Sequence, residues 1–224
     1  MLLNNDKLSE FINCTKEHVQ SKVFLKYFKI TSIFATLALI IGANIGMRFH
    51  TFTADAIDFI FSSTSVAIAA YLSDTYFRIA FIWINNSILL VLPFIALYYI
   101  ILFKHRDSTE NIQSNFVLNG IIVYFNFILI YNIFIIGIVS GYVIDKFSIV
   151  APVIMFGPHG ILEIPCVYIG IIFITSLAKR YANDYKGFKK IMSVYLPISI
   201  FILGIAAIIE IVITPLIIKF LLLQ

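Results

Sequence analysis

Three ionisable side chains lie inside long apolar segments of this chain, namely His159, Glu163 and Glu210. Placing an ionised side chain at the centre of a bilayer costs roughly 2.5 to 3.5 kcal/mol on insertion scales, so such residues are functional by default. His159 and Glu163 are four residues apart and would share one face of a helix. The alternative interpretation is that these groups hydrogen-bond neighbouring helices and only stabilise the bundle.

The chemistry open to this set is limited by its residue types. One imidazole and two carboxylates can ligate a divalent ion, which makes His159, Glu163 and Glu210 candidate metal ligands with zinc as the candidate ion. The same groups could act as a general acid and base or as a proton relay. Asn85 and Asn86 reach a similar depth from another apolar segment, so one polar cluster would satisfy all five groups. No H-E-x-x-H, nucleotide-binding or Ser-His-Asp pattern assigns a catalytic residue.

The composition predicts which kind of secondary structure positions these residues. Of 224 residues, 61% are hydrophobic and 12% are charged, and the mean hydropathy is +0.99. The apolar runs are about twenty residues long, enough to cross hydrocarbon as helices. The sequence therefore predicts an all-α, polytopic transmembrane helix bundle in contact with the lipid bilayer. The net charge of +4 does not indicate nucleic acid, because the basic residues lie in short segments between apolar runs.

Five spans are predicted, at residues 27–47, 77–103, 116–144, 158–177 and 191–218. The spacing of apolar residues in 1–26 predicts a cytoplasmic amphipathic tail on the membrane surface. We expect residues 27–224 to form a single transmembrane domain. Residues 48–76 predict an additional interfacial or re-entrant helix. Because proline suits the first turn of a helix, Gly157-Pro158 predicts a broken helix, with the fourth span starting at Pro158.

The distribution of basic residues predicts the orientation. Most of the sixteen Lys and Arg residues lie in the amino-terminal tail and after the second and fourth spans. Since such residues are retained in the cytoplasm, we expect a cytoplasmic amino terminus, an extracytoplasmic carboxyl terminus and a location in the cytoplasmic (plasma) membrane. Two glycine pairs, Gly42 with Gly46 and Gly137 with Gly141, predict close approach of helices, either within one chain or in a homo-oligomer.

Three motifs resemble one known family. Residues 157–165 resemble the P-H-G-x-x-E-x-P signature of the stage II sporulation protein M (SpoIIM) family, and residues 206–215 resemble its A-A-x-I-E-x-x-x-T-P motif. Asn85-Asn86 is similar to the asparagine pair of that family, but the usual glycine-rich continuation is missing, since large residues follow Pro93. The resemblance implies a multi-span membrane protein without established enzymatic activity. It also implies work with other membrane or envelope proteins, in sporulation or in the maturation, export or immunity of circular bacteriocins.

The leading hypothesis is a non-enzymatic membrane scaffold or export component, whose outer-facing polar cluster holds the bundle and receives a partner or peptide. The main alternative is an intramembrane metal-dependent hydrolase or peptide-processing enzyme that uses His159, Glu163 and Glu210. A proton-coupled transporter is the third hypothesis, and it is less favoured because the five predicted spans show no internal repeat.

Overall fold

The computed structural model describes residues 5–49, 74–106 and 112–222, and regular structure in this part of the chain is helical throughout. The helices are α1 (Asn5–Val19), α2 (Lys22–Arg48), α5 (Thr75–Arg106), α6 (Ile112–Lys146), α7 (Ala151–Arg180), α8 (Tyr185–Ile208), the π-helix η1 (Ile209–Ile213) and α9 (Thr214–Leu222). The interfacial or re-entrant helix predicted within 48–76 falls almost wholly outside the described residues.

Five stretches of the described chain are long and apolar enough to cross a membrane. They are Lys22–Arg48, Thr75–His105, Asn115–Lys146, Gly160–Arg180 and Tyr185–Ile217. Each corresponds to one of the apolar runs in the sequence, so the predicted all-α bundle with five spans is confirmed. The chain is a multi-pass membrane protein.

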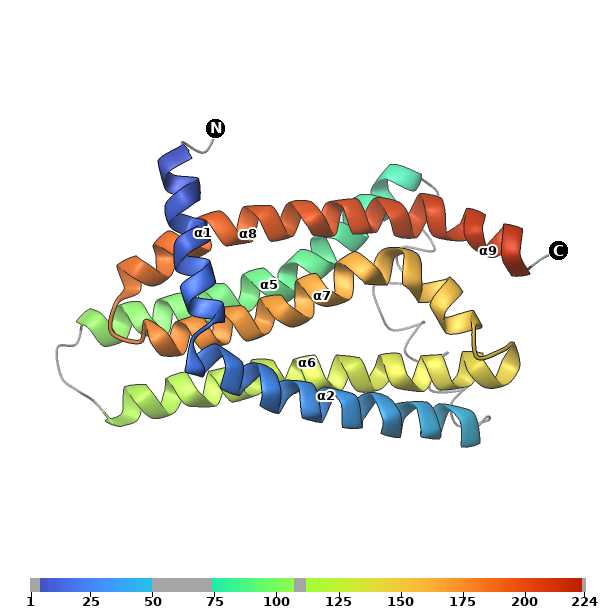
Figure 1. The fold of residues 1–224 in the computed structure, drawn as a ribbon, viewed down its shortest axis with the longest axis horizontal. Helices are drawn as coiled ribbons and strands as arrows, with labels where there is room; N and C mark the ends of the chain where they lie inside the picture. The colour runs from blue at the N-terminus through green and yellow to red at the C-terminus, as the bar shows by residue number, and fades with distance from the viewer. Residues whose placement is uncertain (1–4, 50–73, 107–111, 223–224) are drawn as a thin grey trace.

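The fourth span is the centre of the bundle. α7 packs against α2, α5, α6 and α8, and residues 170–178 are buried without interruption. A helix that is apolar on all sides can bury its whole circumference in this way. Figure 1 shows α7 between two pairs of helices, α2 with α6 on one side and α5 with α8 on the other.

α2 and α6 lie side by side along most of their length (Figure 1). The glycine pairs explain this closeness, because a Cβ atom added at Gly137 would lie 2.6 Å from the carbonyl oxygen of Leu39 on α2. A Cβ atom at Gly42, Gly46 or Gly141 would likewise overlap the backbone of the opposite helix. The glycines therefore serve packing within the chain, and a homo-oligomer stays a prediction.

The interruption predicted at Gly157-Pro158 takes the form of a bend rather than a helix end. α7 is continuous from Ala151 and contains both Pro158 and Pro165, so the expectation that a helix starts at Pro158 is corrected. In Figure 1 the first turns of α7 run at an angle to the rest of the helix. Proline bends a helix because its ring clashes with the preceding turn and removes one hydrogen bond.

The second and fifth spans are joined by a tryptophan as well as by apolar contacts. The indole Nε1 of Trp83 on α5 donates a hydrogen bond of 2.7 Å to the carbonyl oxygen of Ile200 on α8. Gly204, one turn after Ile200, leaves room for the indole ring, since a Cβ atom there would lie 3.2 Å from Nε1. This contact fixes α5 against α8 near the level of Asn85 and Asn86.

Candidate functional site

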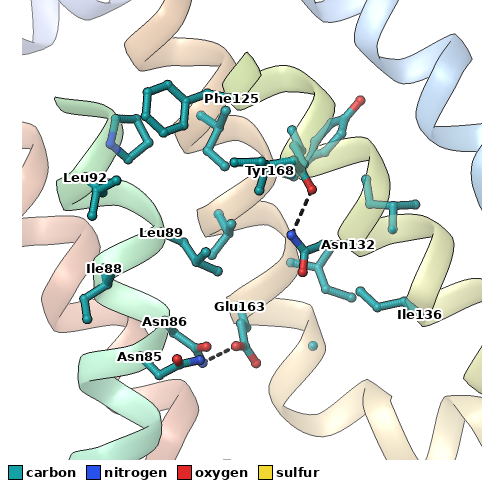
Figure 2. Close-up of a pocket in the computed structure, with 18 residues that line it drawn as sticks. Asn85, Asn86, Ile88, Leu89, Leu92, Phe125, Asn132, Ile136, Glu163 and Tyr168 are labelled. Carbon is teal, nitrogen blue, oxygen red and sulfur yellow. Dashed lines mark hydrogen bonds between the residues drawn. The ribbon is translucent and has the colours of Figure 1, made fainter. Parts of the chain in front are cut away.

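The two halves of the candidate site meet where α5 packs on α7. Asn86 on α5 is 8% exposed, and its Nδ2 donates a hydrogen bond to Oε1 of Glu163 on α7. Figure 2 shows the amide and the carboxyl group facing each other between the two helices. Both residues lie in spans, where an unpaired polar group is costly, so each group serves as the hydrogen-bond partner of the other.

Glu210 approaches the same place from the last span. It lies in η1, which touches α7, and its carboxyl group interacts electrostatically with that of Glu163. Of the site residues predicted from sequence, Asn86, Glu163 and Glu210 are therefore brought together by three different spans. Two neighbouring carboxyl groups in a medium of low dielectric form a strong attraction for a cation or a hydrogen-bond donor.

The backbone around Glu210 departs from an α-helix for a local reason. Pro215 has no N–H to offer the carbonyl group four residues earlier, and its ring crowds that position. The chain widens into a π-turn, in which both the N–H and the Oγ1 of Thr214 donate to the carbonyl oxygen of Ile209, Oγ1 at 3.1 Å. π-turns within helices are frequent at functional sites. The sequence analysis predicted no turn here, and Pro215 is the residue that could have indicated it.

A cavity of about 390 Å³ opens beside the Asn86–Glu163 contact, between α5, α6 and α7. Asn85, Asn86 and Glu163 line one end of it, and Leu92, Phe125 and Tyr168 line the other (Figure 2). Asn85 is exposed on α5 beside Asn86. The cavity is therefore apolar along its length and polar at the Glu163 end, a combination typical of a ligand site with one anchoring group.

Two other asparagines within the spans, Asn132 and Asn44, do not join the cluster. Asn132 lines the cavity, but its Nδ2 donates to the carbonyl oxygen of Ile128 in its own helix at 2.8 Å. Asn44 donates in the same way to Ile40 of α2, also at 2.8 Å. Both amides are exposed and donate to a carbonyl oxygen of their own helix rather than to another span.

The metal hypothesis needs His159, whose backbone belongs to α7 but whose side chain lies outside the described part of the structure. Among the described residues, no group of three His, Cys, Asp or Glu side chains is close enough to hold a metal ion. Glu163 and Glu210 supply two carboxyl groups of the predicted ligand set. A metal at His159, Glu163 and Glu210 stays a prediction, which metal analysis of the purified protein and of His159→Ala would check.

A second buried polar contact was not predicted from the sequence. His18 on α1 is 0% exposed, and its Nε2 lies 2.9 Å from Oγ of Ser176 on α7. Its ring packs edge-on against Phe24 and Phe173. Burial, helped by the nearby positive charge of Arg180, lowers the pKa of His18 to about 4. His18 lies in a polar stretch that predicts a surface helix, so no signal in the sequence singled it out.

α1 is held at the end of the bundle by this histidine. In Figure 1 the helix runs across the spans rather than along them, in front of α7 and α8. Phe11 and Cys14 pack against the apolar core, and Glu17 lies 4.0 Å from Arg180 at the end of α7. The sequence prediction of an amphipathic helix in the amino-terminal tail agrees with this arrangement, while its position on the membrane surface stays a prediction.

The arrangement defines a class of protein: a helical membrane protein with five spans in its described residues, in which an amide on one span contacts a carboxyl group on a second, and a carboxyl group on a third lies near enough to interact electrostatically. Residues 79–215 match the family described as Stage II sporulation protein M (SpoIIM), and the chain belongs to this family. The matched region contains Asn86, Glu163 and Glu210, and it confirms the resemblance carried by the three motifs. No curated protein and no solved structure matches the chain.

Proposed function

We propose that this protein is a non-enzymatic scaffold or export component of the cytoplasmic membrane, and that it receives a partner molecule at Asn86, Glu163 and Glu210. The observation that carries the proposal is the contact between Asn86 and Glu163 at the polar end of a cavity within the spans. Placing a carboxyl group inside a bilayer costs several kcal/mol of desolvation free energy, so such a residue is rarely retained for packing alone. Membership in the SpoIIM family supports the scaffold interpretation.

The orientation of the site follows from the charge distribution. Glu163 lies three residues after Gly160, at the end of the fourth span opposite to the basic residues Lys179 and Arg180. Since basic residues are retained in the cytoplasm, the site faces the outer side of the membrane. A partner would therefore reach the cavity from the extracytoplasmic leaflet or from outside the cell.

Complementation in the native host tests the proposal. We expect Glu163→Gln and Glu210→Gln, expressed at wild-type levels and folded, to lose the ability to replace the deleted gene and to mislocalise its envelope partners. The amide keeps the size of each side chain and removes its ability to ionise. Asp145→Asn is the matched control, because Asp145 is an exposed carboxylate at the end of α6, outside the cavity. Full complementation by both glutamine variants would refute a functional role for the site.

A further inference from the structure

The cavity beside Glu163 has the size and the surroundings of a lipid site. Its volume of about 390 Å³ lies at the lower end of the range for small-ligand pockets. All of its described lining residues belong to the spans on α5, α6 and α7, so the cavity lies within the membrane. Ile88, Leu92 and Ile164 line it and are 47%, 55% and 42% exposed, respectively. The cavity therefore opens on the surface that faces lipid.

The apolar lining residues of the cavity favour an acyl chain as its occupant. A water molecule needs two to four polar partners, and the walls away from Glu163 offer mainly Ile, Leu and Phe side chains. An empty cavity would forfeit the dispersion contacts of those walls. From Glu163 to Ile171 the cavity follows α7 for about 12 Å, at 1.5 Å per residue, which is long enough for a substantial part of one extended chain.

The polar end of the cavity selects the head group. Glu163 presents a carboxyl group there, with the amides of Asn85 and Asn86 beside it and the Glu210 carboxyl group close by. Among the described lining residues none is basic, so the cavity wall itself provides no cation for these carboxyl groups. The hydroxyl of Tyr168 donates to Ser32 on α2 at 2.8 Å and is engaged outside the cavity. The charge complement of this end is an ammonium group.

We infer that the cavity binds a lipid with an amino head group, with one acyl chain between α5, α6 and α7 and the ammonium group at Glu163. The lipid belongs to the leaflet at the Gly160 end of the fourth span, because Glu163 lies about 5 Å from that end. The inference rests on the proposed function in one respect, namely that Glu163 is the group that receives the partner. It assigns that partner a chemical class.

The test uses the full chain in vesicles of phosphatidylethanolamine and phosphatidylglycerol with a trace of a photoactivatable lipid. The probe carries a diazirine on its acyl chain and either an ethanolamine or a glycerol head group, and labelled peptides are mapped by mass spectrometry. We expect the ethanolamine probe to label the cavity walls of α5, α6 and α7 about tenfold more than the glycerol probe, the effect of one charge-assisted hydrogen bond. Glu163→Gln should abolish this preference while chain labelling persists.

Variants that fill the cavity distinguish lipid bound inside it from lipid that only surrounds the protein. Leu89→Phe and Ile128→Phe narrow the cavity from two different walls and should each reduce labelling by both probes. Leu37→Phe is the control for Leu89→Phe, because Leu37 is 49% exposed on α2 and does not line the cavity. Single-tryptophan fluorescence of Trp83 establishes that each variant is folded, and either filling variant alone suffices for the test.

Two results would overturn the inference. One is equal labelling by the two probes in the wild-type protein, which would indicate bulk acyl chains without head-group recognition. The other is unchanged labelling in a folded filling variant. If either occurs while Glu163→Gln still fails to complement, the lipid inference is wrong and the proposed function stands. If lipid labelling behaves as expected and both Glu163→Gln and Glu210→Gln complement fully, the proposed function is wrong and the lipid site stands.

Discussion

Asn86 on α5 donates its side-chain hydrogen bond to Glu163 on α7, within the spans and at the polar end of the cavity. Asn85, its neighbour in sequence, is exposed on the same helix. Successive residues of a helix point about 100° apart, so only one of the two asparagines can face α7 directly. The pair thus provides its own control for the energetic value of the contact.

Asn86→Ala should destabilise the protein by about 1 to 3 kcal/mol, because the partly buried Glu163 carboxyl group would lose its hydrogen-bond donor on α5. Asn85→Ala should change the free energy of unfolding by less than about 0.5 kcal/mol, as exposed substitutions usually do. Unfolding in mixed micelles, followed by the fluorescence of Trp83, measures both. Equal losses in the two variants would show that the buried amide has no special role.

Gly137→Ala should lower stability by about 1 to 3 kcal/mol, because the new methyl group would press on the backbone of α2 at Leu39 and Ala43. Backbone atoms cannot move aside as a flexible side chain can. Gly120→Ala on the same helix is the matched control, since a Cβ atom there would meet nothing within 4 Å. The control should be neutral or slightly stabilising, by up to about 1 kcal/mol from helix propensity. A neutral Gly137→Ala would contradict the close packing of α2 on α6.

The docking of α1 should weaken as the pH falls from 6.5 towards 4. His18 has a pKa of about 4 when docked and its usual 6.5 when α1 is released, so only the released state binds a proton in this window. The docked state therefore keeps its full stability above pH 6.5 and loses on the order of 3 kcal/mol by pH 4. Below that value both states are protonated and the dependence ends.

Hydrogen–deuterium exchange of the α1 amides, corrected for the intrinsic effect of pH on exchange, measures this docking. His18→Gln keeps a group that can hydrogen-bond Ser176 and removes the titration, so its corrected exchange should not change across the same window. Arg180, whose charge acts on His18, and Glu17, which lies 4.0 Å from Arg180, remain in the variant. Identical pH profiles for wild type and variant would assign the effect to another group.

A reporter fused after Gln224 should be active outside the cytoplasm and inactive inside it. Five spans place the two ends of the chain on opposite sides of the membrane, and the basic residues of α1 and of the α7–α8 connection favour the cytoplasmic side. A fusion ahead of α1 should give the opposite result. Cytoplasmic activity of the carboxyl-terminal fusion would reverse the assignment of the site to the outer face.

The spans and the family could be predicted from sequence because both depend on local patterns. Runs of about twenty apolar residues satisfy the bilayer whatever their neighbours do. Glu163 and Glu210 were identifiable for the same reason, since a carboxyl group in such a run has no local partner. Their shared depth also led to the expectation of one polar cluster, whereas the direct partner of Glu163, Asn86 rather than Asn85, depends on how α5 packs on α7.

The features that escaped prediction depend on partners distant in the sequence. His18 is buried by Ser176, which lies 158 residues later, and nothing around His18 in the chain indicates that contact. Pro158 suggested a helix start because proline lacks an N–H, yet α7 is continuous through it and is bent there. The glycine pairs indicated that helices approach closely but not which helices do so. The structure shows that α2 packs on α6.

The widened turn at Ile209–Ile213 also affects how the last span tolerates changes in length. A π-turn accommodates one residue more than the α-turn it replaces, so a chain lacking a residue here could close into a regular α-helix with α8 and α9 still in line. Such a shortened relative would keep its packing and shift the backbone that carries Glu210. A gap of a single position at this point of an alignment would therefore mark a protein with an altered carboxyl pair.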